Sequence, residues 1–168
     1  MATFTGTLSI VINALLDSGL DIGTGRHSIS ETYSNAFTSG TGANQANEVW
    51  ADTRTISSSS SDDLDLYGSL TDAFGTTLNF TSIKAIIIKA SSSNGDNLSV
   101  GGDAGAPIST IFADTSDEIL VPPGGMFMIT NPQADGFAVT NTTADVLEIT
   151  NTDSGDSAEY DIIIVGEV

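Results

Sequence analysis

The side chains that could do chemistry in this chain are mostly carboxylates. The sequence contains 22 aspartate and glutamate residues, one histidine and no cysteine. Without cysteine, the chain has no disulfide, no thiolate zinc site and no thiol nucleophile. The single histidine, His27, lies in a glycine-rich stretch, and no G-x-S-x-G sequence is present to position a nucleophilic serine. We therefore expect His27 to be an ordinary surface residue, and we expect no catalytic residues.

A pair of carboxylates can hydrolyse a glycosidic bond when one acts as acid and the other as base or nucleophile. Nothing in the sequence marks two of the acids as such a pair. Aromatic residues, which commonly line sugar-binding sites, make up only 7% of the chain and are scattered along it. We therefore predict that the protein is not an enzyme.

Acidic turns offer a second kind of chemistry, because calcium prefers loops that are rich in oxygen ligands. Such turns occur at residues 94–97, 101–105, 114–118 and 153–156. None of them matches the D-x-[DN]-x-[DN]-G pattern of a calcium loop, and the preference of Asp, Asn and Gly for turns explains them without an ion. We expect no metal and no cofactor, with a structural calcium ion as the alternative.

The acidic stretch that begins at Asp62 has three interpretations: a linker, a carboxylate cluster or a strand. Leu64 and Leu66 are two residues apart and share one face of an extended chain, whereas Asp63 and Asp65 lie on the opposite face. A linker does not need this spacing, and Asp62 points away from the other two acids. The pattern predicts a half-buried strand whose acids form a solvated face.

The charge of the chain excludes some classes of partner. Its formal net charge is −18 at pH 7, whereas nucleic-acid-binding proteins are basic because they neutralise phosphates. Binding to an anionic membrane surface is disfavoured for the same reason. The acids favour solubility, with adaptation to high salt as the alternative. The start of the chain lacks a basic region and a long apolar core, so we expect neither a signal peptide nor a membrane span.

Short alternating segments dominate the rest of the sequence. The strongest is Ile83–Ala90, in which two lysines lie near the ends, where we expect their ammonium groups to reach water. An Asn-Gly turn and a Pro-Pro-Gly-Gly turn separate it from later segments. The further strands are expected near residues 3–12, 48–56, 62–69, 98–100, 108–112, 118–121, 126–130, 137–140, 145–150 and 159–168.

These segments predict an all-β fold, an antiparallel β-sandwich of jelly-roll-like form with an extended N-terminal segment. Residues 23–47 are polar and glycine-rich, and they form either a long arm or a loop-rich hairpin. We expect residues 1–47 to be an N-terminal strand with this arm or loop region, and residues 48–168 to be the β-sandwich domain. The apolar run at residues 162–165 suits a central strand that is buried on both faces, or a strand at a subunit interface.

Several stretches, read together, resemble a family of small virion-associated structural proteins of tailed bacteriophages. The resemblance spans nearly the whole chain and is carried by its start, MATFTGTLSI, by the run ANQANEVWADTRTISSSSSDDLDLYGSLTDAFGTTLNFTSIKAIIIKA, and by VGGDAG, VPPGG, FAVTNTTADVLEITN and YDIIIVGEV. It rests on overall sequence texture and includes no catalytic signature.

The resemblance implies a capsid decoration or cement protein, a homotrimer that binds the major capsid protein or another virion protein. Such a protein stabilises the assembled shell by binding only that state, and it belongs to a virion that assembles in the host cytoplasm. The interface candidates are anchors in the N-terminal region: Phe4, Leu8, Ile10, Tyr33 and Phe37. The alternatives are a tail, neck or fibre-associated domain, and a module that binds a carbohydrate or receptor on the host surface.

Overall fold

The computed structural model describes residues 3–102 and 105–168, and within them the chain forms strands and turns without a helix. The prediction of an all-β fold is confirmed. The strands are β1 (Thr5–Gly19), β2 (Thr24–Ser39), β3 (Gln45–Ala46), β4 (Glu48–Ile56), β5 (Ser61–Asp65), β6 (Tyr67–Thr71), β7 (Thr77–Asn79), β8 (Ser82–Ala90), β9 (Leu98–Gly101), β10 (Glu118–Val121), β11 (Met126–Thr130), β12 (Phe137–Ala138), β13 (Val146–Asn151) and β14 (Ala158–Glu167).

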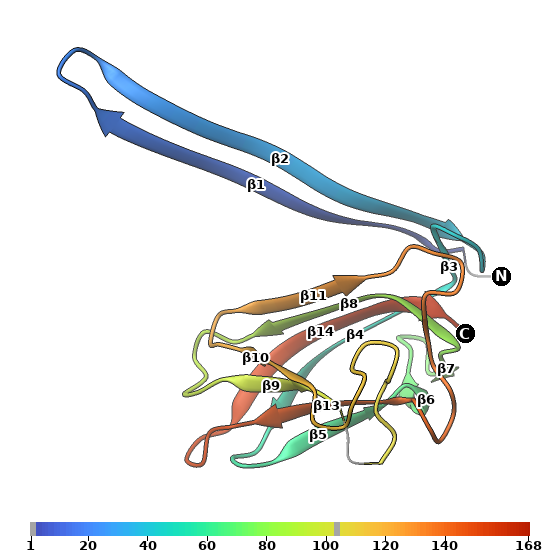
Figure 1. Ribbon diagram of the computed structural model, residues 1–168. Helices are drawn as coiled ribbons and strands as arrows, with labels where there is room; N and C mark the ends of the chain where they lie inside the picture. Colours follow the sequence, from blue (N-terminus) through green and yellow to red (C-terminus); the bar gives the residue numbers. More distant parts are fainter. Residues whose placement is uncertain (1–2, 103–104) are drawn as a thin grey trace.

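Two antiparallel sheets face each other and form a sandwich (Figure 1). The upper sheet has the order β11-β8-β14-β4, with β12 added to β8, and the lower sheet has the order β10-β9-β13-β5. Along the chain, the strands of these sheets alternate between the two layers, except that β9 and β10 both lie in the lower sheet and β11 and β12 both lie in the upper sheet. The short pair β6–β7 lies at one end of the sandwich.

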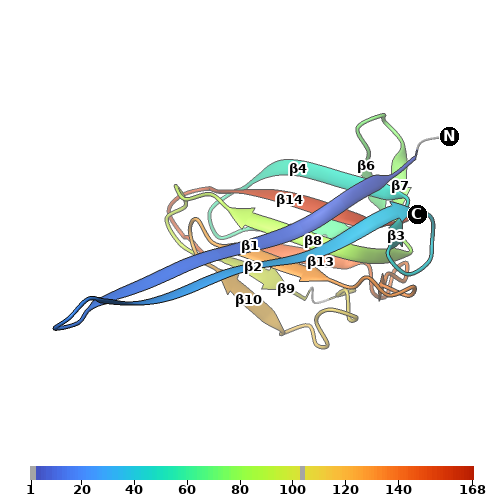
Figure 2. The same cartoon turned by 90° about the horizontal axis from the view of Figure 1, so that it is seen from above.

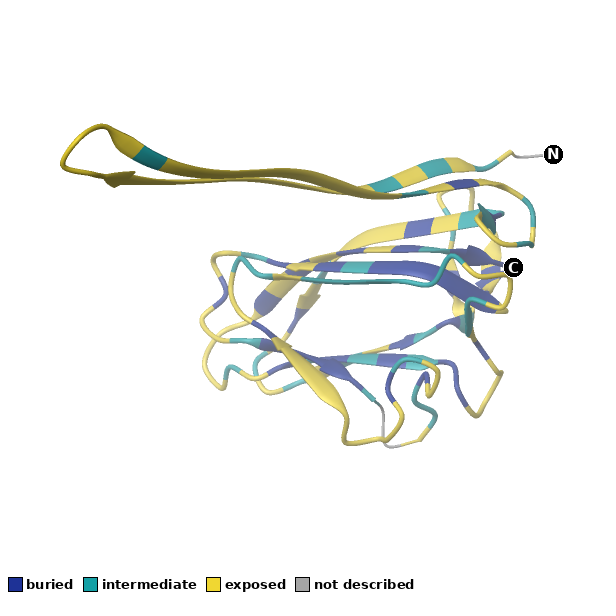
Figure 3. Ribbon diagram, turned by 45° about the horizontal axis from the view of Figure 1, so that its top comes forward, coloured by how far each residue is buried: buried dark blue, intermediate teal, exposed yellow. Residues whose placement is uncertain are grey.

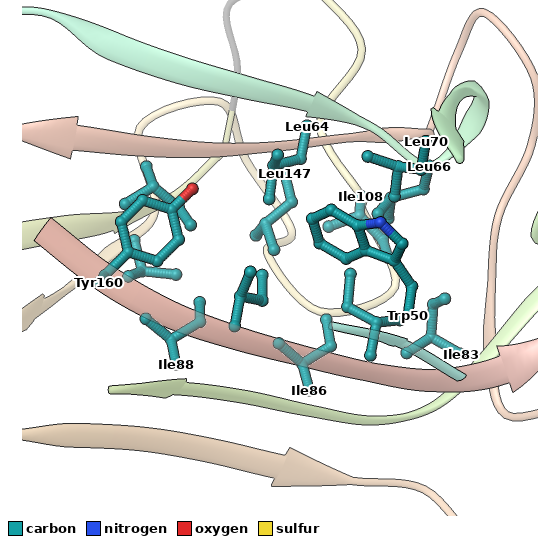
Figure 4. Packing of buried hydrophobic residues seen from close by; sticks show 14 of the residues in the cluster. Trp50, Leu64, Leu66, Leu70, Ile83, Ile86, Ile88, Ile108, Leu147 and Tyr160 are labelled. Atoms are coloured by element: carbon teal, nitrogen blue, oxygen red, sulfur yellow. The ribbon is translucent and has the colours of Figure 1, made fainter. Parts of the chain in front are cut away.

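The hydrophobic core lies between the two sheets, where alternate residues of facing strands meet (Figure 4). In β14, Ile162 and Ile164 are buried, whereas Ile163 between them is 41% exposed on the outer face of the upper sheet. This alternation follows from the period of two in a strand. The run at 162–165 therefore lies in a central strand, as predicted, but the predicted burial on both faces is wrong, because the outer face remains partly exposed.

β1 and β2 form a long two-stranded hairpin that runs over the outer face of the upper sheet and extends beyond it (Figures 1 and 2). Their register is continuous from the pair Thr5 and Thr38 to the pair Gly19 and Thr24. The tip is a turn at residues 20–23, in which Gly23 adopts a φ of +93°, a conformation that favours glycine. Within residues 23–47, β2 forms a regular strand of 16 residues that pairs with β1, so this segment is mainly extended and not rich in loops.

β8 contains an irregularity that simple alternation does not predict. Its register against β14 shifts at the Val165–Gly166 step, where Gly166 lies opposite Ile83 and not opposite Lys84. Such a β-bulge exchanges the inward and outward sides of a strand. Ile83 therefore joins the core beside Ile86, although the sequence pattern assigned these two residues to opposite faces.

The prediction that both lysines of β8 reach water is wrong for Lys84. Its side chain is fully buried, with Nζ 2.9 Å from Oε1 of Glu167. The same Nζ donates hydrogen bonds to the backbone carbonyl oxygens of Gln133 (2.8 Å) and Ala134 (2.6 Å). The bulge brings the ammonium to these acceptors, which compensate for its lost hydration. Lys89, at the other end of the strand, is exposed as predicted.

The predicted strand at residues 108–112 is also wrong, because this segment forms a turn. The backbone N–H groups of Ile111 and Phe112 both donate to the carbonyl oxygen of Ile108. Ile108 and Phe112 are buried, so one helical turn places both side chains against the core. Two apolar residues four positions apart lie on the same side of a helical turn and also on the same side of a short strand. The sequence pattern therefore does not distinguish a turn from a strand here.

The acidic stretch after the serine run forms a strand, β5, as predicted, but the prediction of one strand over residues 62–69 is wrong, because β5 ends at Asp65 and β6 pairs with β7 in another sheet. Leu64 is 1% exposed and Leu66 is fully buried, while Asp63 is exposed on the other face. β5 pairs with β13, in which Leu147 lies opposite Leu64 and is buried with it.

We predict that Leu64→Asp lowers the free energy of unfolding by more than about 3 kcal/mol, because it places an unpaired charge in the core. Asp63→Asn is expected to change it by less than about 0.5 kcal/mol, because the side chain is exposed and makes no ion pair. Chemical denaturation followed by circular dichroism measures both values. The reverse ranking would show that the two faces of β5 are assigned incorrectly.

Candidate functional site

The outer arm, which we define as residues 9–34, is the part of the hairpin that extends away from the sandwich (Figure 3). Every residue in it is exposed except Gly25, which is half-buried. A folded segment of this length normally buries one of its faces. The outer arm therefore presents a surface that its own chain leaves largely uncovered, although Ile10 and Tyr33 at its inner end line an open hollow with Met128 of β11.

The apolar residues of the outer arm are concentrated on one face. In an antiparallel pair, residues opposite each other project to the same side, and the register places Ile10 opposite Tyr33 and Leu16 opposite His27. We call the large apolar side chains of this face the stripe: Ile10, Ile12, Leu16, Ile29 and Tyr33.

The opposite face of the outer arm is mostly polar, with serine, asparagine and threonine at most positions. Val11 and Leu15 are its large apolar side chains, 61% and 59% exposed. Arg26 donates two hydrogen bonds to the carboxylate of Asp17 on this face, at 2.9 and 3.1 Å. An exposed ion pair of this kind contributes little to stability, so the two faces differ mainly in apolar area.

The base of the hairpin shows how the stripe face packs when a surface is available to it. Phe37 is 2% exposed, and Phe4 and Leu8 are half-buried. They line an apolar cavity of about 270 Å³ between the hairpin and the outer face of the upper sheet. The sheet contributes the following side chains: Val49, Ala85, Ile87, Ile163 and Val165.

Polar contacts fix the base of the hairpin to the sandwich. The amide of Asn35 donates to Oγ1 of Thr130 on β11 (3.1 Å), and the N–H of Asn44 donates to the carbonyl oxygen of Pro132 (2.8 Å). β3 adds a short parallel pairing to β2, with Thr38 opposite Gln45. The hairpin is therefore attached at one end only.

The structure separates the five residues predicted from the sequence as interface anchors into two groups. Phe4, Leu8 and Phe37 pack on the chain's own sheet, whereas Ile10 and Tyr33 lie directly opposite each other on the outer arm and are 37% and 61% exposed. The register places the four that lie in β1 and β2 on one face of the hairpin.

Sequence reasoning missed three members of the stripe, Ile12, Leu16 and Ile29. The signal was present, because the even-numbered positions of β1 are apolar from Leu8 to Leu16, and only Val11 and Leu15 interrupt the alternation. It also missed the tip, where Leu20 is 61% and Ile22 is 94% exposed. Isolated apolar residues in a turn carry no periodic signal.

The area of the stripe face limits the free energy that its burial against a partner can contribute. The β1 half of the outer arm spans about 35 Å, and a two-stranded ribbon is about 10 Å wide, so one face presents about 350 Å². Glu31 and His27 also lie on this face, so only part of the area is apolar. Burying it would therefore contribute less than about 9 kcal/mol, the value that a fully apolar face would give at about 25 cal/mol per Å², before the entropy of association is subtracted.

A charged cluster at the edge of the sandwich is the other candidate for chemistry. Arg54 donates two hydrogen bonds to the carboxylate of Asp62, at 2.5 and 2.9 Å, and the hydroxyl of Tyr160 donates to the same carboxylate at 2.8 Å. A second carboxylate, Asp52, accepts from Arg54 at 3.1 Å. The prediction that the acids of the 62–65 stretch form a solvated face is therefore wrong for Asp62.

The electrostatics of this cluster fit a structural role. Burial alone would raise the pKa of Asp62, but the hydrogen bonds from Arg54 and Tyr160 outweigh it, and the pKa of this carboxyl lies below its usual value. Burial and the hydrogen bond to Asp62 raise the pKa of Tyr160, so its hydroxyl stays protonated at neutral pH. Each charged group has a partner, and the three side chains join β4, β5 and β14.

The acidic turns use their carboxylates for their own backbone. Asp114 accepts hydrogen bonds from the N–H and hydroxyl of Ser116, and Asp153 accepts from the N–H groups of Gly155 and Asp156. The turn at 101–105 lies partly outside the described residues. Among the residues that are described, no three or more His, Cys, Asp or Glu side chains are grouped so that they could hold a metal ion.

The structure places His27 on the exposed stripe face of the arm, away from the charged cluster. In the described part of the chain, no helix is long and apolar enough to cross a membrane. No protein-family model, no curated protein and no solved structure matches the sequence or the fold.

The lowered pKa of Asp62 predicts how stability depends on pH. Because the pKa is lower in the folded chain than the unfolded value of about 3.9, the folded state binds fewer protons and this stabilisation is complete above about pH 4. It is lost as the pH falls through the folded pKa. Asp62→Asn is expected to lower the free energy of unfolding by about 1 to 3 kcal/mol at pH 7 and to remove this part of the acid dependence.

Urea unfolding of the wild-type protein and Asp62→Asn between pH 2.5 and 7 tests this prediction. The gap between the two curves is expected to narrow below pH 4, and Asp63→Asn, which alters an exposed neighbour, serves as the control. A gap that stays constant over the whole range would contradict the assigned role of Asp62.

Proposed function

We propose that this chain is a non-enzymatic structural protein of a virion, and specifically a decoration or cement protein that binds an assembled capsid shell and stabilises it. One observation carries the proposal: the chain builds an arm about 35 Å long that buries almost none of its surface and presents an apolar stripe to the outside. An arm of this kind can bury its apolar stripe when other subunits lie within its reach.

The physics of a two-stranded ribbon supports assembly over a solitary role. A hairpin that packs on nothing is marginally stable in water, and contiguous exposed apolar surface marks interaction sites. Long edge strands with free N–H and C=O groups are also avoided in monomeric proteins because they pair with other chains. The outer arm combines all three features. A partner that covers its stripe would stabilise the hairpin and bury the exposed apolar surface.

The order of the strands in the sandwich also supports the proposal. The arrangement β4-β14-β8-β11 opposite β5-β13-β9-β10 agrees with a jelly roll, in which eight strands form two four-stranded sheets. Jelly rolls are common in viral capsid proteins and also in lectins. Because a fold alone does not define a function, the arm is the stronger argument.

The distribution of charge fits a position on the outside of a shell. Residues 5–39 contain three acids and one arginine, a net charge of −2, so most of the −18 resides outside the hairpin. A strongly acidic sandwich is repelled by packaged nucleic acid and remains hydrated. Binding to the assembled shell alone would then stabilise that state by mass action.

The test uses particles of the virus that carries the gene, purified through a density gradient. The protein is expected in the particle band, and particles that lack it are expected to release their nucleic acid at a lower temperature in a fluorescent-dye melt. Its absence from purified particles would refute the proposal.

A shortened-arm variant tests the contribution of the arm. Leu8 and Asn35 lie opposite each other in the register, so a two-residue Asn-Gly turn can join them in place of residues 9–34 and leave the base intact. We expect at least a tenfold loss of copies retained per particle, measured by quantitative mass spectrometry. The double variant Val11→Ser/Leu15→Ser, altered on the opposite face, is the control and is expected to be retained. Retention of the shortened variant at the wild-type level would show that the arm has no role in attachment.

A further inference from the structure

We propose that the apolar cavity at the base of the hairpin is a binding site for a small neutral aliphatic molecule, such as a straight-chain alcohol of up to about ten carbons. The site lies apart from the outer arm, and its occupation does not depend on a virion. Three features of the cavity point to this class of ligand: its lining, its size and its lack of charge.

Apolar side chains line the cavity from both layers. Phe4, Leu8 and Phe37 of the hairpin lie on one side, and aliphatic side chains of β4, β8 and β14 form the other. Thr5 and Thr7 also border the cavity, but both are exposed, and the period of two in a strand places their hydroxyl groups on the other face of β1. A buried water needs about two to four polar partners. The lining side chains provide none, so an apolar ligand displaces no tightly held water.

Two small residues leave the space between the hairpin and the sheet. Ala85 of β8 is fully buried beneath the hairpin, directly opposite Val165 of β14. Gly6 of β1 borders the cavity above it, and a Cβ atom at this position would come within 2.8 Å of the ring of Phe4. The glycine therefore allows the ring to lie against β1. The cavity follows from the sequence, because larger residues at these two positions would reduce it.

The volume of the cavity sets the size of the ligand. It is about 270 Å³, and since an apolar cavity of about 150 Å³ accommodates benzene, this volume corresponds to about ten carbons. The lining follows β1 from Phe4 to Leu8, over about 13 Å, so the mean cross-section is about 20 Å². A slender space of this kind fits a linear chain better than a fused ring system.

The cavity is open toward β4. Val49 of β4 is 44% exposed and Ile163 of β14 is 41% exposed, whereas Ala85 and Phe37 are buried. A linear molecule can therefore enter from the side of β4, bury its chain beneath the hairpin and keep its polar end in water.

The charge of the site favours a neutral ligand over an ionised one. Among the described residues that line the cavity, none has a charged side chain, so neither a carboxylate nor an ammonium group of a ligand finds a partner there. The whole chain carries −18, which repels fatty acids and other anionic amphiphiles. A hydroxyl group at the mouth of the cavity meets neither obstacle.

Titration of the full-length wild-type protein with straight-chain alcohols tests the site. Amide signals in ¹H–¹⁵N NMR spectra report which residues meet the ligand. We expect saturable shifts at Phe4, Leu8 and Phe37, and unchanged signals for the stripe residues Ile12 and Leu16. Each added CH₂ group is expected to tighten binding about fourfold, so 1-octanol is expected to bind at least about tenfold more tightly than 1-hexanol.

A matched pair of variants locates the site. Ala85→Ile places a larger side chain in the cavity and is expected to lower the affinity for 1-octanol at least tenfold. The same substitution at Ala51, which is exposed on the outer face of β4 and lies outside the lining, is expected to leave the affinity unchanged. If Ala85→Ile does not fold, Phe4→Ala removes a wall of the cavity ahead of the paired part of the hairpin, and it is expected to weaken binding at least threefold.

Three results would overturn the inference. Shifts that do not saturate up to the solubility limit of 1-octanol would show that no site exists, and equal affinities of Ala85→Ile and Ala51→Ile would place the site elsewhere. Sodium octanoate that binds as tightly as 1-octanol would refute the assignment to a neutral ligand. All of these measurements use the isolated protein, so their outcome is separate from that of the particle experiments.

Discussion

The pairing of β8 with β14 is the contact on which the rest of the structure depends. The inner faces of these two central strands supply much of the core, including Ile86, Ile88 and Ile164. Their outer faces form the seat of the hairpin base. The bulge between them directs Lys84 to Glu167 and ties the end of the chain to the loop before β12. One pair of strands thus connects the core, the arm and the C-terminal region.

Much of the sandwich could be predicted from the sequence because strand alternation is a local property. Leu64 and Leu66 identify the buried side of β5 without knowledge of any neighbour. Lys84 could not be predicted, because its burial depends on a bulge and on carbonyl groups of a loop about 50 residues away. The ion pair of Asp62 could not be predicted for a similar reason. Its partners Arg54 and Tyr160 come from other strands, and no spacing in the sequence indicates that these side chains meet.

The candidate interface was predicted in part, and the missing part has a physical cause. Isolated anchors such as Ile10 and Tyr33 were evident as large residues in a polar region. Ile12, Leu16 and Ile29 lie on the same surface as these anchors, but this follows only from the register of β1 against β2. Register depends on the turn at residues 20–23 and on the whole length of the pair, so it becomes visible only in three dimensions.

The attachment of the hairpin at one end only makes it a lever. Its fixed points, Asn35 against Thr130 and Asn44 against Pro132, lie at the base, and residues 9–34 beyond them are exposed apart from Gly25. Over β1, which spans about 50 Å, a tilt of about 5° at the base displaces the tip by about 4 Å. In the proposed assembly, subunits joined by such levers would tolerate unequal spacing, and one sequence would span both the flat and the curved parts of a closed surface.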